Sequence, residues 1–195
     1  MNDRTFDPKH AHKLEDPERL TWLPPMAVLK ALHLKQGMTV ADIGAGTVYF
    51  ALPIAREVGD SGKVLAVDFQ TEMLEHLRRK TSLESSPRNI ELVNGQATVT
   101  KLRDSSVDLV FLANVWHELD DHAAVLTEAK RILRRSGHIV ILDWRPDVPQ
   151  PPGPPLEHRI APKAAAATVQ QEGWTLISKS DVGEYHYLVQ ASTGA

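Results

Sequence analysis

The sequence predicts an α/β protein with a mostly parallel β-sheet and helices on both faces of that sheet. In residues 39–50 an apolar run ends in an acid and a glycine pair, and an apolar segment that can start a helix comes directly after them. Residues 64–68 form a second apolar run that ends in an acid, about 20 residues after the glycines. Further apolar runs alternate with helical patterns along the chain, as is typical of parallel sheets.

The glycine pair Gly44 and Gly46 predicts a loop that binds a nucleotide-type cofactor. Glycine lets the backbone take conformations closed to other residues and lets a ligand lie close to it, and the next helix offers unpaired N–H groups. Asp42 could accept hydrogen bonds from the turn or face a cationic ligand group, and Asp68 stands at the offset at which such folds bind ribose. A nicotinamide dinucleotide would need another glycine where the chain has Tyr49, which disfavours an oxidoreductase.

The composition favours one domain that works on small molecules. A chain of 195 residues with 42% apolar content can bury one sizeable core. We expect an N-terminal extension over residues 1–25 and a single domain over residues 26–195. The net charge of -3 offers no cationic excess for nucleic acid.

The residues that are absent also restrict the function. The chain has no cysteine, which excludes disulfides, thiolate metal sites and a cysteine nucleophile. The first residues are polar, and no apolar run approaches the roughly 20 residues that span a bilayer. We therefore expect a cytoplasmic protein without membrane contact.

Three helices are expected around the first two strands. Residues 26–34 have one apolar side and end near Gly37. Residues 50–58 come after the glycine turn, with a proline in the first turn, where a missing N–H costs little. Residues 71–80 carry cations at the end where they suit the helix dipole.

The middle of the chain predicts three more strands and a helix. Residues 90–93 are a short apolar strand, and residues 106–113 are nearly all apolar, as expected for a central strand buried on both faces. A helical stripe through residues 125–133 ends at two arginines and a glycine, and residues 138–143 form the next strand.

The last part predicts an extended excursion, a helix and a hairpin. The proline cluster in residues 146–155 is incompatible with a regular helix or a central strand. Residues 162–172 then form a helix that a glycine ends. Residues 174–180 and 185–191 alternate in polarity, as the two strands of a terminal hairpin do.

The motifs occur in an order that matches a known family. The stretch from Asp42 to Gly46, Asp68, the Gly95-Gln96-Ala97 turn, and the strands near residues 107–110 and 137–140 resemble the motif series of class I S-adenosylmethionine-dependent methyltransferases. Within that class the chain most resembles small methyltransferases related to the ubiquinone/menaquinone C-methyltransferases and arsenite-methyltransferase-like proteins. The resemblance implies a Rossmann-like, seven-stranded, mostly parallel sheet with an antiparallel last strand.

The resemblance also implies S-adenosylmethionine as cofactor and a set of residues that bind it. Asp68 would meet the ribose, Gln96 would accept a hydrogen bond from the adenine amino group, and Asn114 would lie near the methionine part. Phe69 either contacts the adenine face or is a core phenylalanine. The full set of candidate cofactor-binding residues is Asp42, Gly44, Ala45, Gly46, Asp68, Phe69, Gln96, Ala97 and Asn114.

One position departs from the family pattern. Val48 stands where the family usually has a third glycine, and a β-branched residue there is stiffer and bulkier. Either its side chain points away from the cofactor or the cofactor site is weakened or lost.

The candidate catalytic residues come directly after the central strand. Ligands of open α/β sheets lie beyond the carboxyl ends of the strands, which places Trp116, His117 and Glu118 near the transferred methyl group. His117 either acts as a general base or only shapes the pocket and caps the next helix. Glu118 is more simply explained as a helix first-turn acid.

Further pocket candidates come from the two ends of the chain. By resemblance His158 and Arg159 belong to the substrate pocket, and His158 is the third candidate catalytic residue beside Trp116 and His117. Arg159 could instead be tied to a carboxylate as a loop clamp. Trp144 ends a strand at the expected pocket, and Trp22 could anchor a lid or pack on the flank of the domain.

The expected reaction is methyl transfer from S-adenosylmethionine to a small-molecule acceptor by in-line displacement. The alternative is a homologue that binds the cofactor but is catalytically idle, as Val48 suggests. We expect a monomer or homodimer that binds no nucleic acid. We also expect no metal site, because no close histidine pair with a carboxylate partner occurs in the sequence.

Overall fold

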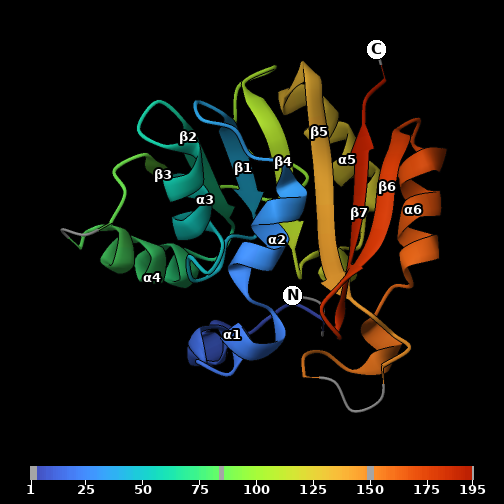
Figure 1. Cartoon of the computed structure of the whole chain (residues 1–195), viewed down its shortest axis with the longest axis horizontal. Helices are drawn as coiled ribbons and strands as arrows, with labels where there is room; N and C mark the ends of the chain where they lie inside the picture. The colour runs from blue at the N-terminus through green and yellow to red at the C-terminus, as the bar shows by residue number, and fades with distance from the viewer. Residues whose placement is uncertain (1–3, 84–85, 149–151, 195) are drawn as a thin grey trace.

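A seven-stranded sheet in the order β3-β2-β1-β4-β5-β7-β6 forms the centre of the computed structural model, which describes residues 4–83, 86–148 and 152–194 (Figure 1). Residues 1–3 of the predicted N-terminal extension and residues 149–151 of the proline cluster lie outside the described part. The sheet confirms the predicted Rossmann-like α/β fold.

The first five strands pair in parallel, and the last two close the sheet in the opposite sense. β7 is antiparallel to both β5 and β6, which confirms the reversed last strand. The strand bounds are β1 Thr39–Ile43, β2 Lys63–Asp68, β3 Ile90–Asn94, β4 Val107–Ala113, β5 Leu133–Trp144, β6 Thr175–Val182 and β7 His186–Ser192.

Helices cover both faces of the sheet, as predicted. Alternate residues of each buried strand face opposite sides; thus Val40 packs with α2, α3 and α4, whereas Ala41 packs with α5 and α6. The helix bounds are α1 Arg19–Trp22, α2 Pro25–Leu32, α3 Ala51–Val58, α4 Thr71–Thr81, α5 His122–Ile132 and α6 Pro162–Gln171, with short 3-10 helices η1 Pro8–Glu15, η2 Trp116–Glu118 and η3 Leu156–His158.

The boundary between α5 and β5 differs from the prediction. The sequence places Leu133 in the helix and starts the strand at residue 138, but α5 ends at Ile132 and Leu133 is already extended. The reason is pairing, since Leu133 is in register with Val107 at the start of β4. A cross-strand partner therefore outweighs the helical pattern of this segment.

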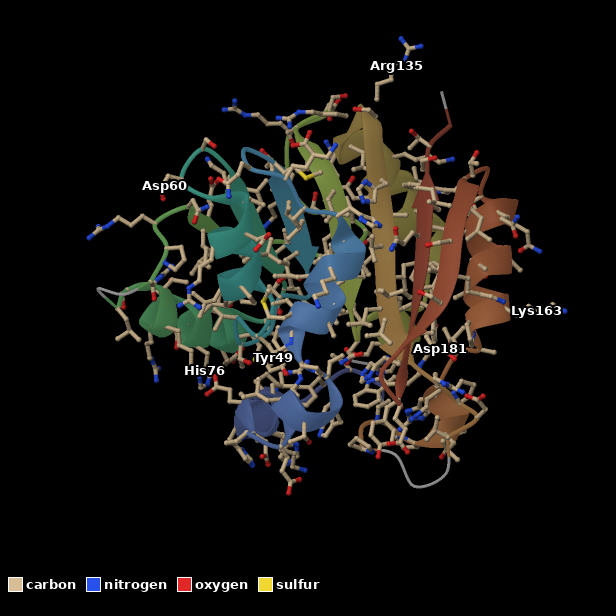
Figure 2. The ribbon with its side chains drawn as sticks, in the orientation of Figure 1. Tyr49, Asp60, His76, Arg135, Lys163 and Asp181 are labelled. Atoms are coloured by element: carbon tan, nitrogen blue, oxygen red, sulfur yellow. The ribbon has the colours of Figure 1, made fainter. Side chains whose placement is uncertain are left out.

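The segment that carries η1 and α1 lies at the carboxyl ends of the parallel strands (Figure 1). Figure 2 shows Tyr49 at this end of the sheet, beside α1, and Arg135 at the opposite end. η1 and α1 therefore stand where open α/β sheets bind their ligands.

Candidate functional site

A cavity of about 1000 Å³ opens beyond the carboxyl ends of the strands. This volume is at the upper end of the roughly 300–1,000 Å³ that is usual for ligand sites, so a cofactor and a second small molecule fit together. Its walls come from the ends of β1, β2, β4 and β5, the turn after β3, and the N-terminal segment. The cavity is lined by every candidate cofactor-binding residue: Asp42, Gly44, Ala45, Gly46, Asp68, Phe69, Gln96, Ala97 and Asn114.

The loop directly after β1, residues 44–49 and here called the glycine loop, has positions that a residue larger than glycine does not fit. Gly44 and Gly46 have φ angles of 71° and 56°, in the left-handed region that favours glycine. A Cβ atom on Gly44 would lie 2.4 Å from Cγ2 of Val115. The amide of Gly44 donates to the carbonyl of Val67 at 2.8 Å, which fixes the loop against β2.

Val48 belongs to the core and not to the cavity. Its φ angle of 74° is one that glycine adopts freely, and for an L-residue this conformation costs about 1–2 kcal/mol. Its side chain is 4% exposed and packs in the core between the sheet and α2 and α3, whereas Thr47 and Tyr49 line the cavity. The departure from the family pattern therefore strains the backbone while leaving the cavity wall free of the valine side chain.

The two strand-end acids, Asp42 and Asp68, differ in their partners. Asp68 accepts hydrogen bonds from the amides of Gly46 and Gln70 at 3.1 and 2.9 Å. Neither carboxylate oxygen of Asp42 has a partner among the described residues, although the residue is only 1% exposed. Burial, with the nearby charge of Asp68, raises the pKa of Asp42 to about 7. A cationic group of a ligand beside Asp42 would offset the free-energy cost of burying this carboxylate without a partner.

The turn after β3 and the end of β4 complete the wall on the cofactor side. Phe69, directly after Asp68, is 45% exposed and lines the cavity. Gln96 and Ala97 line the cavity next to it, in a turn that the pairing of Gln96 with Val99 closes. Asn114 has a φ angle of 59°, and its buried Oδ1 has no partner within the described ranges.

His117 is held by a buried carboxylate. Its Nδ1 lies 2.7 Å from Oδ1 of Asp143 and its backbone amide donates to Oδ2 at 2.8 Å, so both oxygens of Asp143 fix one residue. Burial by itself would lower the pKa of His117, but the charge and hydrogen bond of Asp143 hold it above its ordinary value. The pairing at Nδ1 leaves Nε2 for the cavity that His117 lines.

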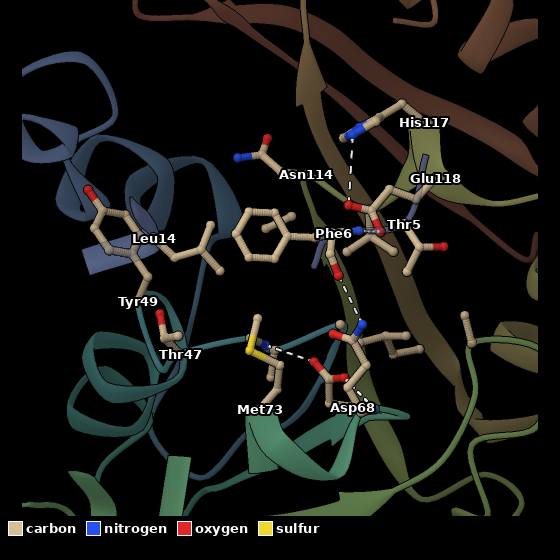
Figure 3. A pocket seen from close by; sticks show the side chains of 18 of the residues that line it. Thr5, Phe6, Leu14, Thr47, Tyr49, Asp68, Met73, Asn114, His117 and Glu118 are labelled. Atoms are coloured by element: carbon tan, nitrogen blue, oxygen red, sulfur yellow. Dashed lines mark hydrogen bonds and ion pairs between the residues drawn. The ribbon is translucent and has the colours of Figure 1, made fainter. Parts of the chain in front are cut away.

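Glu118 connects His117 to the N-terminal segment (Figure 3). Its Oε1 lies 3.9 Å from Nε2 of His117, and its Oε2 accepts a hydrogen bond from the amide of Phe6 at 3.3 Å. The carbonyl of Phe6 accepts from the side chain of Gln70 at 2.9 Å, on the opposite wall. Burial raises the pKa of Glu118 to about 7. The backbone of Phe6 thus bridges two walls of the cavity.

Two of the three candidate catalytic residues do not reach the cavity. Trp116 is fully buried in the core with α5, and its ring packs on His122 at 4.1 Å between centroids. His158 lies half-buried in η3, close in sequence to Pro152 and Pro154 of the cavity wall, but does not itself line the cavity. Of the candidate catalytic residues, His117 therefore stands in the cavity wall.

Arg159 is a clamp on the proline-rich loop rather than a cavity residue. Its guanidinium donates to the carbonyl oxygens of Pro152, Pro154 and Arg145 at 2.8–3.0 Å. The expected loop clamp is thus present, but its acceptors are carbonyl groups and not a carboxylate. Trp144, stacked on the same arginine at 5.1 Å, lines the cavity as expected, and so does Trp22.

Asp143, Phe6, Gln70 and Arg19 contribute to the site although the sequence analysis does not predict it. The sequence does contain a signal for Asp143, because this acid stands close to the end of an apolar strand, as Asp68 does. The other three act through contacts over long separations, such as the 64 residues between Phe6 and Gln70, for which no local pattern exists.

Neither a membrane span nor a metal cluster occurs in the described part of the chain. No helix there is long and apolar enough to cross a membrane. Within the same residues, no group of three or more histidine, cysteine, aspartate and glutamate side chains is arranged to hold a metal ion.

Comparison with known proteins gives consistent matches. A family model described as a methyltransferase domain matches residues 41–141. The demethylmenaquinone methyltransferase of Staphylococcus saprophyticus is 34% identical over 116 residues, which cover 60% of this chain and 48% of the relative. That of Listeria monocytogenes is 30% identical over 122 residues, covering 62% and 51%. The matches thus span about half the length of these curated relatives.

Solved structures extend the likeness over the whole fold. A SAM-dependent methyltransferase from Aquifex aeolicus is 33% identical and superposes with a TM-score of 0.90, covering 96% of this chain and 98% of that chain. The [4+2]-cyclase SpnF, at 13% identity and a TM-score of 0.73 over 87% and 80% of the chains, shares the fold alone.

Proposed function

The chain belongs to the family of S-adenosylmethionine-dependent methyltransferases, and we propose that it transfers a methyl group to a small-molecule acceptor bound in the same cavity as the cofactor. The observation that carries the proposal is that His117, fixed by Asp143, lines one cavity together with Asp42 and Asp68. A proton acceptor and the donor-side residues thus share one enclosed space.

The cavity fits S-adenosylmethionine through the chemistry of its walls. Asp42, buried without a partner among the described residues, would pair with the ammonium of the methionine part. Asp68 would accept hydrogen bonds from the ribose hydroxyls, and the exposed ring of Phe69 would stack on the adenine. Gln96 would accept from the adenine amino group. When bound, the cofactor supplies a methyl group on a sulfonium that an acceptor displaces in line.

The role of His117 is to accept a proton from the acceptor. The Asp143 carboxylate keeps Nδ1 engaged, so the neutral imidazole presents Nε2 as the basic atom. A hydroxyl or an acidic carbon needs such a base, whereas an acceptor that is already a strong nucleophile does not. His117 therefore favours an oxygen or carbon acceptor.

An aromatic acceptor suits the wall opposite the cofactor side. Trp22 and Trp144 both line the cavity, and the half-buried Trp22, which packs on the buried Trp144 ring at 5.4 Å between centroids, gives aromatic surface for a planar molecule. The relatives named demethylmenaquinone methyltransferases lend support to a quinol-like acceptor. We propose a reduced quinone or a related phenol.

The N-terminal extension, residues 1–25, is proposed as a lid over a methyltransferase domain of residues 26–195. Its support is the bridge that Phe6 makes between Gln70 and Glu118 across the cavity. Closing the cavity excludes water during transfer.

A cofactor-binding but idle protein is the second candidate, and the strained backbone at Val48 favours it. Turnover separates this alternative from an enzyme: micromolar S-adenosylhomocysteine binding by the natural chain in calorimetry, with no labelled product in a methyl-transfer assay, would support the idle protein. Binding that appears only in a Val48→Gly variant would mean that Val48 has disabled the cofactor site, and would overturn both candidates.

Transfer itself is tested with isotopically labelled S-adenosylmethionine and a panel of hydroquinones and phenols. We expect a labelled product, and a roughly 10²–10⁴-fold slower rate for His117→Asn. His76→Asn, which changes a histidine on α4 that does not line the cavity, is the matched control. A rate that His117→Asn leaves unchanged would contradict the role of His117 as a base.

A further inference from the structure

Arg19 is a buried cation in the cavity wall. It is the first residue of α1, it lines the cavity, and only 6% of its surface is exposed. Its Nη1 donates to the carbonyl oxygen of Leu14 at 2.9 Å, and its buried Nε has no hydrogen-bond partner in the described part of the chain. Within the same residues no carboxylate pairs with it, so its charge is uncompensated.

The guanidinium is held in place by an aromatic platform. Its central carbon lies 3.9 Å from the centroid of the Tyr49 ring, and the Tyr49 hydroxyl donates to the carbonyl of Leu23 at 2.6 Å. Tyr49 belongs to the glycine loop, and Leu14 reaches to 3.5 Å from a Cβ placed on Gly46. Arg19 is therefore fixed beside the loop on which the cofactor is expected to lie.

A buried guanidinium without a counter-charge is costly, and proteins normally pair such groups. Arg159 shows the ordinary solution near the same cavity, because carbonyl oxygens accept from its donors in four hydrogen bonds. Arg19 donates a hydrogen bond to the Leu14 carbonyl through Nη1. Its other guanidinium N–H groups keep the planar, forked arrangement that can donate two parallel hydrogen bonds to a carboxylate. The unused capacity indicates a ligand with an anionic oxygen group.

We propose that Arg19 receives a carboxylate group of a bound ligand, an inference that rests on the proposed function. Two sources offer this chemistry: the amino-acid part of the cofactor, and an acid group on the acceptor. The position beside the glycine loop favours the cofactor. Asp42 strengthens this assignment, since a buried carboxylate and a buried guanidinium, neither with a counter-charge among the described residues, would then match the two charges of an amino acid.

Calorimetry with two probes separates carboxylate binding from a merely structural role. S-adenosylhomocysteine carries the amino-acid part, whereas 5′-methylthioadenosine has the same nucleoside without it. We expect Arg19→Gln to weaken S-adenosylhomocysteine binding about 30-fold or more and to leave 5′-methylthioadenosine binding unchanged. Arg19→Lys keeps the charge without the fork and should lose less. Arg56→Gln, an exposed arginine on α3, is the matched control.

A second arm tests the acceptor as the source, with benzoate titrated into the protein saturated with S-adenosylhomocysteine. Benzoate binding that Arg19→Gln abolishes, with S-adenosylhomocysteine binding intact, supports the carboxylate site and assigns it to the acceptor. Equal losses for both nucleosides would mean that Arg19 only supports the fold of the segment, and would overturn the inference. An Arg19→Gln variant that binds both nucleosides and benzoate as tightly as the natural chain does would also overturn the inference. These two results leave the proposed function standing, whereas failure of the natural chain to bind either nucleoside would overturn the proposed function together with the inference.

Discussion

Burial raises the pKa of two acids that face the cavity, and a neighbouring carboxylate raises that of the histidine. The pKa values of Asp42 and Glu118 are each raised to about 7 because burial withdraws both carboxyl groups from water and so disfavours their charged forms. The pKa of His117 is raised for a different reason, because the charge of Asp143 stabilises the protonated imidazole. Asp42 and Glu118 therefore titrate near pH 7, where small changes of pH alter the charge of the cavity.

Asp42 should make the ligand-free protein less stable as the pH rises. Its folded pKa of about 7 exceeds the value of 3.8 in the unfolded chain, so the native state binds more protons between these values and loses stability as pH climbs through that window. We expect Asp42→Asn to match the natural chain near pH 4 and to be ~1–3 kcal/mol more stable at pH 8. Urea unfolding across this range is the measurement. A difference that stays constant with pH would contradict the buried, unpaired carboxylate.

The pair of Asp143 and His117 should be visible in the pH dependence of methyl transfer. The base form of His117 exists above its pKa, and Asp143 holds that pKa above 6.5, so the rate should rise with pH through an apparent pKa above this value. In Asp143→Asn the pKa of His117 falls, so the limb should move to lower pH while the maximal rate drops roughly tenfold or more. The profile of kcat measures both effects. Identical profiles for the two proteins would show that Asp143 does not act through His117.

Among the secondary-structure elements, the site is built from the segments at the carboxyl end of each strand. The acids that end β1 and β2, the glycine loop and the segment after β4 could be predicted, because parallel strands bring their carboxyl ends to one edge. The start of β5 and the roles of Phe6 and Arg19 could not, because they depend on Val107, Gln70 and Tyr49, partners that no local pattern specifies. Trp116 shows the same limit, since a short 3-10 turn directs it into the core while His117 lines the cavity.

The glycine loop allows a test of backbone strain against core packing. Val48→Gly relieves the left-handed strain, worth about 1–2 kcal/mol, but removes a buried side chain worth about 1.5–3 kcal/mol and adds backbone freedom to the unfolded chain. Packing should win, leaving the variant about 1 kcal/mol less stable. Affinity for S-adenosylhomocysteine should change little, because the side chain faces the core.

Val48→Ala is the matched control for this test, since it loses most of the packing but keeps a Cβ in the left-handed conformation. It should be no more stable than Val48→Gly in the same unfolding experiment. An alanine variant clearly more stable than the glycine variant would show that strain at this position is negligible.

Across the molecule as a whole, the cavity is closed by chain that is remote in sequence from the strands. The segment from Arg4 to Trp22 supplies Phe6, Leu14 and Arg19 to its wall. The lid role proposed for this segment implies that a bound ligand leaves only when the segment moves away, so ligand exchange and opening of the segment would be coupled.

This coupling predicts that the cofactor protects the N-terminal segment. With S-adenosylhomocysteine at 100 times its dissociation constant, hydrogen exchange in residues 4–22 should slow by up to ~100-fold, because each opening must expel the ligand. The amides of β6, on the far edge of the sheet, serve as the internal reference. Exchange in residues 4–22 that ignores the ligand would contradict the closing role of the segment.

The reversed strand β7 ties the beginning of the chain to its end. His186, its first residue, lies parallel to the Trp22 ring at 5.8 Å between centroids, and Gln190 donates to the carbonyl of Ala31 at 2.8 Å. α1 and α2 therefore dock on a strand that is synthesised after all the others and must insert between β5 and β6. A nascent chain that has not yet released β7 from the ribosome has the glycine loop but no finished enclosure around it. We therefore expect the chain to capture the methyl donor only after β7 has been synthesised and has paired with β5.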